Sequence, residues 1–371
     1  MKFLSKLKSG WKLPSAGLPT AATDQIARAL SAAGLDDTGA GASIRATIDN
    51  ALANAGLQPR RDVAVPHIRA KRDGRGHASP ATSQTDTPAA GGQFLHASHS
   101  NAHGRRDYRL YLPIGYDASG AALPLIVMLH GCTQSAEDFA VGTRMNALAD
   151  QHGFLVAYPQ QVPNANQAKC WNWFRREDQN GDAGEPSILA GIARQVGQDH
   201  RVDMDRVFVA GLSAGAAMAV ILGRTHPTLF RAIGVHSGLP YASAHDMPSA
   251  FAAMQGRGAA VRNDAIANSA QGPLIVFHGD KDSTVAHSNA DALASQAARP
   301  GLTSNIETGR AAGGQAYTRR VAADPAGRAW LESWTLHGAG HAWSGGDPAG
   351  SYTDASGPDA SAAMVAFFLR Q

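Results

Sequence analysis

The most constraining feature of this sequence is the pentapeptide Gly211-Leu212-Ser213-Ala214-Gly215. The apolar run 207–210 precedes it and predicts a buried strand, and the alanine-rich stretch 214–224 predicts a helix. A serine in a sharp strand-to-helix turn needs neighbours with almost no side chain, and the first helical N–H groups then lie beside its hydroxyl. The pentapeptide therefore predicts a nucleophile elbow with Ser213 at its tip.

Apolar runs and helical patterns alternate from about residue 93 to the end of the sequence. The expected strands are 108–112, 125–129, 154–158, 207–210, 232–236, 274–277 and 330–336. The expected helices are 136–151, 187–200, 214–224 and 359–369. Unbroken apolar strands that alternate with helices are typical of a mostly parallel sheet covered on both faces. We therefore predict an α/β protein with the α/β-hydrolase fold.

The first quarter of the sequence differs from the rest in composition and residue pattern. Two short helical patterns, 26–35 and 48–57, share the form I-x-x-A-L-x-x-A-G-L. The stretch 58–92 is rich in Pro, Gly, Ser, Thr and Arg, as linkers are. We therefore expect a basic N-terminal extension, 1–92, followed by a catalytic domain, 93–371.

Charge and hydropathy narrow the class of protein. Residues 1–90 hold 12 Lys and Arg against 7 Asp and no Glu, which predicts either a solvated arm or contact with an anionic surface. The net charge of the whole chain, +3, is too small to indicate a nucleic-acid partner. The sequence contains no run of about 18 apolar residues, so no membrane span is predicted. Lys6, Lys8 and Lys12 interrupt any apolar signal segment, so we expect a cytoplasmic protein or one already processed.

A serine hydroxyl needs a base, and the base needs an acid that fixes its tautomer. In this fold the order along the chain is serine, acid, histidine. An apolar strand leads into H-G-D-K-D-S-T-V, which places Asp282 in the loop beyond the strand, while Asp280 is expected to cap the turn. His341 follows the last strand in a glycine-rich loop, whereas His337 is too close to the strand end. The predicted catalytic triad is Ser213, Asp282 and His341.

Ester hydrolysis also needs N–H donors for the oxyanion of the tetrahedral intermediate. The residue after the nucleophile, Ala214, is one expected donor. The turn after an early strand supplies the other, and here an apolar strand ends in Leu129-His130-Gly131-Cys132. We predict that the backbone N–H groups of Ala214 and Cys132 form the oxyanion hole and that His130 braces the turn.

The two cysteines, Cys132 and Cys170, are too few for a disulfide framework. They form either one disulfide, which would tie an aromatic loop to the oxyanion turn, or two reduced thiols. Trp173 and Trp343 flank the predicted catalytic loops, so we expect them to bind substrate, with core packing as the alternative. The acidic stretch 178–185 lacks EF-hand spacing and is expected to be a solvated helix-capping turn. No metal site or cofactor is predicted.

Six segments together make the sequence resemble the poly(3-hydroxybutyrate) depolymerase family of esterases, which is related to feruloyl and acetylxylan esterases. They are 129–135 (LHGCTQS), 158–161 (YPQQ), 170–174 (CWNWF), 184–187 (GEPS), 211–215 (GLSAG) and 340–346 (GHAWSGG). The resemblance covers about residues 93–371. It implies an α/β-hydrolase fold, the triad Ser213–Asp282–His341 and hydrolysis of short-chain polyesters or aryl esters. Because members are often secreted, it favours an extracytoplasmic location.

The sequence and the resemblance together predict a serine esterase that forms an acyl-enzyme and needs no cofactor. The expected substrate is a poly(3-hydroxybutyrate)-type polyester or its oligomers. One alternative is a feruloyl- or acetylxylan-type carboxylesterase, or a hydrolase of other polyesters, aromatic ones included. Another is a granule- or surface-binding protein that uses the N-terminal helices as an anchor. Oligomeric state is not predicted.

Overall fold

The computed structural model of this protein describes residues 91–258 and 272–371. The predicted helices at 26–35 and 48–57, and most of the predicted linker, lie outside the described residues. The division of the chain at residue 92 therefore stays a prediction.

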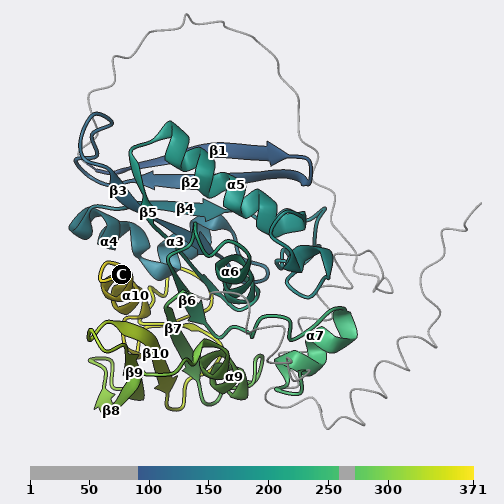
Figure 1. The fold of residues 1–371 in the computed structure, drawn as a ribbon, viewed down its shortest axis with the longest axis vertical. Coiled ribbons are helices and arrows are strands. Elements are labelled where there is room, and N and C mark those ends of the chain that lie inside the picture. Colours follow the sequence, from purple (N-terminus) through teal and green to yellow (C-terminus); the bar gives the residue numbers. More distant parts are fainter. Residues whose placement is uncertain (1–90, 259–271) are drawn as a thin grey trace, which may run out of the picture. The chain divides into compact units, whose positions relative to one another are not determined.

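Within the described residues, ten strands form one sheet in the order β1-β2-β4-β3-β5-β6-β7-β10-β9-β8 (Figure 1). The strands are β1 (Gln93–Asn101), β2 (Gly104–Leu112), β3 (Leu123–Leu129), β4 (Leu155–Pro159), β5 (Val202–Leu212), β6 (Ala232–His236), β7 (Leu274–Gly279), β8 (Thr303–Arg310), β9 (Ala316–Ala323) and β10 (Ala329–Leu336). The central run β4-β3-β5-β6-β7-β10 is parallel throughout. Antiparallel pairs extend both edges. A separate short parallel pair joins β11 (Trp343–Ser344) to β12 (Thr353–Asp354).

Helices cover both faces of this sheet, because each face of the central strands is apolar. In β3, for example, Leu125 and Val127 pack into one core cluster, and Ile126 and Met128 into the other. The first cluster lies under α5 (Gly184–Asp199), α6 (Ala214–Thr225), α7 (Met247–Met254) and α9 (Ser288–Ala297). The second lies under α3 (Ala136–Thr143), α4 (Met145–His152) and α10 (Ala360–Phe368). The predicted α/β-hydrolase fold is confirmed.

Several expected elements differ in detail. The single helix predicted at 136–151 is two helices, because Arg144 adopts a left-handed conformation (φ 53°) between α3 and α4. The Arg144 guanidinium donates to the Gly345 carbonyl at 2.8 Å and to Asp359 at 2.7 Å, which stabilises the break. Strand β1, which contains His96 and His99, is not among the expected strands. Strand β8 is exposed at nearly every position, so it carries no apolar pattern from which to predict it.

The topology places four strand ends at one edge of the sheet. The parallel strands β5, β6, β7 and β10 end at Leu212, His236, Gly279 and Leu336, and the loops that follow them carry the predicted triad. In open α/β sheets the carboxyl edge is where ligands bind. Among the described residues, no helix combines the length and apolarity that crossing a bilayer requires.

Candidate active site

Ser213 occupies a strained turn between β5 and α6, as the pentapeptide predicts. Its backbone has φ 57° and ψ −120°, a combination that is rare for a residue with a side chain. A Cβ on Gly215 would lie 2.1 Å from the Leu129 carbonyl oxygen, and one on Gly211 would lie 2.5 Å from the Gly215 carbonyl carbon. Only glycine fits at these two positions, because the strand, the turn and the helix pack backbone against backbone. The Ser213 N–H donates to the His236 carbonyl at 2.9 Å.

His341 and Asp282 form a close, shielded pair. The His341 Nδ1 lies 2.7 Å from Asp282 Oδ2, and the side chains are 12% and 0% exposed. The other carboxylate oxygen of Asp282 accepts the N–H groups of Thr284 at 2.9 Å and Val285 at 2.8 Å. Burial raises the pKa of Asp282. The hydrogen bond from His341, the charge of His341 and the hydrogen bond from the Val285 N–H lower it by more, so the pKa of Asp282 is below its ordinary value. Asp282 is therefore an anion that can fix the His341 tautomer.

The structure has no hydrogen bond between Ser213 and His341, both of which belong to the described part of the chain. Bonds of this kind are often long without substrate and shorten in the substrate complex. The two residues nonetheless follow strands of the same sheet edge, separated in the strand order by β6 and β7.

The rival residues Asp280 and His337 also pair, but on the surface. His337 Nδ1 lies 3.0 Å from Asp280 Oδ2, with side chains 44% and 32% exposed. The other oxygen of Asp280 accepts the Gly338 N–H at 2.7 Å, and Thr318 Oγ1 lies 2.9 Å from His337 Nε2. Both histidine nitrogens are therefore occupied. The Asp280 carboxylate therefore binds an N–H of the loop that carries His341, and the pair joins that loop to the one that carries Asp282.

His236, at the end of β6, links the elbow to the histidine loop, and the sequence contains no motif that marks it. It is fully buried, its carbonyl accepts the Ser213 N–H, and its Nε2 accepts the Ser344 N–H at 3.0 Å. Its ring stacks between Phe277 and Trp343. Burial above all, with the nearby histidines 278 and 341, lowers the pKa of His236 to about 3.

This buried histidine predicts a loss of stability in acid. The unfolded chain takes up a proton near pH 6.5 and the native state only near pH 3, so stability is present above pH 6.5 and is lost as the pH falls. Between pH 7 and 4.5, His236 alone should remove about 2–3 kcal/mol from the free energy of unfolding. Urea denaturation at both pH values measures how far the free energy of unfolding falls between them, and this fall should be smaller by about that amount in His236→Gln than in wild type. An equal fall in the two proteins would contradict the lowered pKa of His236.

The predicted oxyanion turn leaves one N–H free. The N–H of Gly131 donates to Gln134 Oε1 at 2.9 Å, and that of Thr133 donates to the Ala168 carbonyl at 2.6 Å. Between them, the Cys132 N–H has no acceptor within the described residues. The Ala214 N–H opens α6, where the first N–H groups have no partner inside the helix.

Cys132 and Cys170 are joined by a disulfide, so of the two predicted alternatives the disulfide is confirmed and the pair of reduced thiols is not.

The tryptophans predicted to bind substrate are buried. Trp343 is 1% exposed, its indole N–H donates to Ser361 Oγ at 3.0 Å, and its ring packs edge-on against Phe139. This burial matches the core-packing alternative. Trp173 is 6% exposed and packs edge-on against Phe174, so contact with substrate stays a prediction for it.

Two acidic side chains of the stretch predicted as a solvated turn are buried, whereas a third, Asp182, is exposed. Asp178 and Glu185 are both 4% exposed. Asp178 Oδ1 accepts the Glu185 N–H at 2.7 Å, so the predicted capping of the helix is present, whereas the predicted solvation of these two side chains is wrong. Among the described residues, no group of three or more His, Cys, Asp or Glu side chains is arranged to hold a metal ion.

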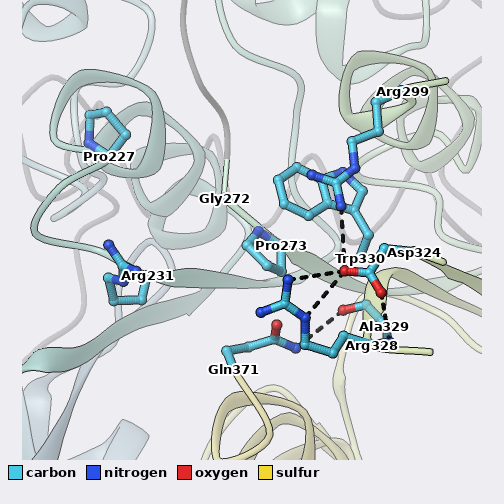
Figure 2. Close-up of a pocket in the computed structure, with 10 residues that line it drawn as sticks. All are labelled: Pro227, Arg231, Gly272, Pro273, Arg299, Asp324, Arg328, Ala329, Trp330 and Gln371. Carbon is cyan, nitrogen blue, oxygen red and sulfur yellow. Dashed lines mark hydrogen bonds and ion pairs between the residues drawn. The ribbon is translucent and has the colours of Figure 1, made fainter. Parts of the chain in front are cut away.

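A cavity of about 240 Å³ lies at the opposite edge of the sheet, where β6, β7 and β10 begin (Figure 2). Arg231 and Pro273, which directly precede β6 and β7, line it together with Trp330 near the start of β10. The Arg299 guanidinium stacks 3.4 Å from the Trp330 ring centroid. The cavity contains none of the predicted catalytic residues, so it is separate from the candidate active site.

Comparison with known proteins identifies a family that this chain matches and two similar proteins. Residues 106–320, more than half of the chain, match the family described as esterase PHB depolymerase. The poly(3-hydroxyalkanoate) depolymerase C of Paucimonas lemoignei is 32% identical over 62% of this chain and 57% of its own length. The poly(3-hydroxybutyrate) depolymerase of Ralstonia pickettii is 29% identical over 62% of this chain and 51% of its own length. The chain thus spans little more than half of each relative.

A solved structure supports the fold. The acetyl xylan esterase from Aspergillus awamori superposes with a TM-score of 0.57 at 17% identity, over 76% of this chain and 100% of that one. At this identity the similarity concerns the fold alone.

Proposed function

Because this chain belongs to the esterase PHB depolymerase family, we propose that it is a carboxylic ester hydrolase that uses Ser213 as nucleophile. The observation that carries the proposal is the 2.7 Å hydrogen bond between His341 and a fully buried Asp282, at the sheet edge where Ser213 occupies a strained elbow. A nucleophile, a base and an acid that orients the base are the minimum set for acyl transfer.

In the proposed mechanism, His341 Nδ1–H donates to Asp282, which leaves Nε2 free to take the Ser213 proton. The Ser213 oxygen attacks the ester carbonyl, and the N–H groups of Cys132 and Ala214 hold the resulting oxyanion. His341 then returns the proton to the departing alcohol. Water, activated by the same histidine, releases the acid from the acyl-enzyme.

The substrate we propose is a polyester of 3-hydroxy acids, or its oligomers. The names of the two depolymerase relatives support this choice. The same chemistry would serve acetylxylan or feruloyl esters, which relatives with acetylxylan and feruloyl esterase names favour. A panel of poly(3-hydroxybutyrate) suspension, hydroxybutyrate oligomers, acetylated xylan and methyl ferulate separates these substrates, and a preference for methyl ferulate over the oligomers would overturn the polyester assignment.

The test of the mechanism compares wild type with Ser213→Ala on p-nitrophenyl butyrate. We expect kcat to fall by about 10⁴-fold or more, because the variant has no nucleophile to form an acyl-enzyme. Ser283→Ala is the matched control, since Ser283 is exposed and lies beside Asp282 in the same loop. It should keep wild-type activity. Equal activity in Ser213→Ala and wild type would refute the mechanism, and no hydrolysis of any ester by wild type would favour a binding protein.

A further inference from the structure

A buried ion pair joins β2 to the start of α5. Arg106 Nη2, from β2, lies 3.1 Å from Glu185 Oε1 at the start of α5, with side chains 9% and 5% exposed. Removing two charges from water is costly, and such a pair often adds little stability over apolar residues of the same volume. The position of this pair therefore needs an explanation beyond stability.

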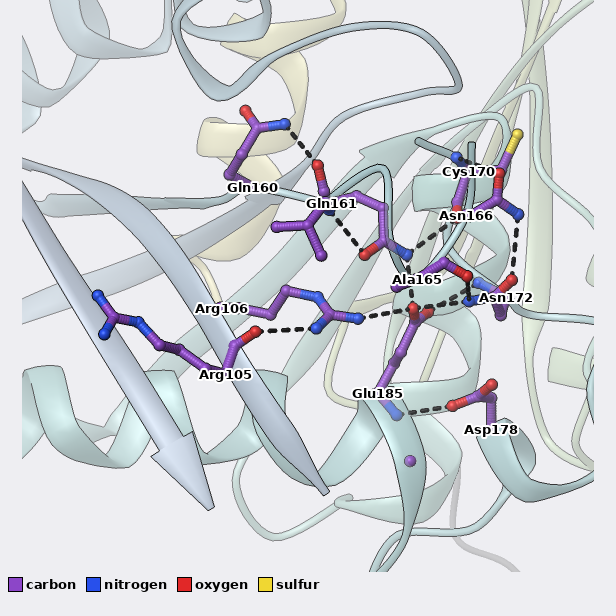
Figure 3. A network of polar contacts seen from close by, with 12 residues as sticks. Arg105, Arg106, Gln160, Gln161, Ala165, Asn166, Cys170, Asn172, Asp178 and Glu185 are labelled. Carbon is purple, nitrogen blue, oxygen red and sulfur yellow. Dashed lines mark hydrogen bonds and ion pairs between the residues drawn. The ribbon is translucent and has the colours of Figure 1, made fainter. Parts of the chain in front are cut away.

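The Glu185 carboxylate holds the loop that follows β4 (Figure 3). Oε2 accepts the Asn172 backbone N–H at 2.7 Å. Oε1 accepts the side-chain amides of Asn172 at 2.9 Å and Gln161 at 2.5 Å, besides the Arg106 guanidinium. Every partner of the two oxygens is a donor, which suits an anion and not a neutral amide.

Two connections run from this loop to the oxyanion turn. In the first, the Gln161 side chain also donates to the Cys170 carbonyl at 2.9 Å, and Cys170 is joined to Cys132 by the disulfide. In the second, the Gln161 backbone N–H donates to His130 Nε2 at 3.1 Å, and His130 Nδ1 donates to the Gly131 carbonyl at 2.7 Å. The two connections meet on either side of the peptide bond whose N–H belongs to Cys132.

We propose that Glu185 is a positioning residue for the oxyanion hole, an inference that rests on the proposed function. Its carboxylate fixes Gln161 and Asn172, and through them the orientation of the Cys132 N–H. An oxyanion donor acts only when it lies about 2.7–3.1 Å from the developing charge, and a displacement of about 1 Å removes much of the effect. Because the donor acts on the transition state, its displacement lowers kcat and leaves substrate binding nearly unchanged.

The test replaces Glu185 by glutamine, which keeps the shape and places an N–H₂ group against donors. Active sites are counted with the organophosphate paraoxon, and p-nitrophenyl butyrate hydrolysis is expressed per titrated site. We expect kcat to fall about 10- to 100-fold while KM stays within about threefold of the wild-type value. Butylboronic acid binds serine as a tetrahedral anion, so the affinity of the variant for it should fall in parallel with kcat. Glu137→Gln, which removes a more exposed ion pair with Arg109, should change none of these values.

A second variant keeps the test decisive if Glu185→Gln does not fold. Gln161→Met retains the Arg106–Glu185 pair and cuts both side-chain bonds to Cys170 and Glu185, so it should lower kcat per titrated site in the same direction. Unchanged kcat per site in the folded variants overturns the inference, and so does a loss confined to the number of titrated sites. A wild-type protein that paraoxon does not label contradicts the proposed function itself, which separates the two failures.

Discussion

Replacing Asp282 by asparagine should lower kcat for p-nitrophenyl butyrate by about 10⁴-fold. Asparagine can still accept the Thr284 and Val285 N–H groups through its oxygen, so the loop should keep its position. Its amide N–H₂ would then face His341 Nδ1. The histidine would be driven to the tautomer with the proton on Nε2, where it cannot take the Ser213 proton.

The matched control is Asp280→Asn. Asp280 lies in the same loop as Asp282 and also binds a histidine and a backbone N–H, here those of His337 and Gly338, but it lies on the surface. Replacing Asp280 should leave kcat within about threefold of the wild-type value, since exposed ion pairs of this kind contribute little free energy. Steady-state kinetics of the two variants, with circular dichroism to verify folding, make the comparison. If Asp280→Asn lost more activity than Asp282→Asn, the proposed triad would be assigned to the wrong pair.

Gly215→Ala should be the most damaging single-methyl change in the catalytic core. Its Cβ would meet the carbonyl oxygens of Leu129 at 2.1 Å and His130 at 2.5 Å, and these backbone atoms lead directly into the proposed oxyanion turn. Neither can move without shifting β3 or α6. We expect a loss of about 3 kcal/mol in the free energy of unfolding, together with a loss of more than about 100-fold in kcat.

Gly340→Ala is the control for this prediction. A Cβ at Gly340 meets no heavy atom within 4 Å, although this residue directly precedes His341. Its free energy of unfolding should stay within about 0.5 kcal/mol of wild type in urea denaturation. Similar stabilities for the two variants would show that the close approach at Gly215 is not as tight as described.

The central half of the fold was predictable because its strands are buried on both faces. The predicted strand 232–236 has the bounds of β6, and the predicted runs 207–210, 274–277 and 330–336 lie within β5, β7 and β10, whose ends form the sheet edge that collects the candidate catalytic residues. Ser213, Asp282 and His341 were selected from local patterns and chain order, and the structure brings two of them into contact. Their catalytic roles remain proposals.

Other features had no local signal. Strand β8 pairs by backbone bonds on an exposed edge, so its sequence lacks the alternation that marks a half-buried strand. The stretch from Asp178 to Glu185 is polar, so its local sequence indicates a solvated turn. The donors that compensate the buried Glu185 carboxylate come from Arg106, Gln161 and Asn172, outside this stretch. His236 was missed for the same reason: its contacts to Ser213 and Ser344 bridge distant segments.

Whether Ser213 is the nucleophile is tested by labelling the protein with paraoxon and mapping the adduct by peptide mass spectrometry. We expect one diethylphosphoryl group per molecule, attached to Ser213, with ester hydrolysis lost in proportion to labelling. An adduct on another residue, or hydrolysis that persists in fully labelled protein, would contradict Ser213 as the nucleophile.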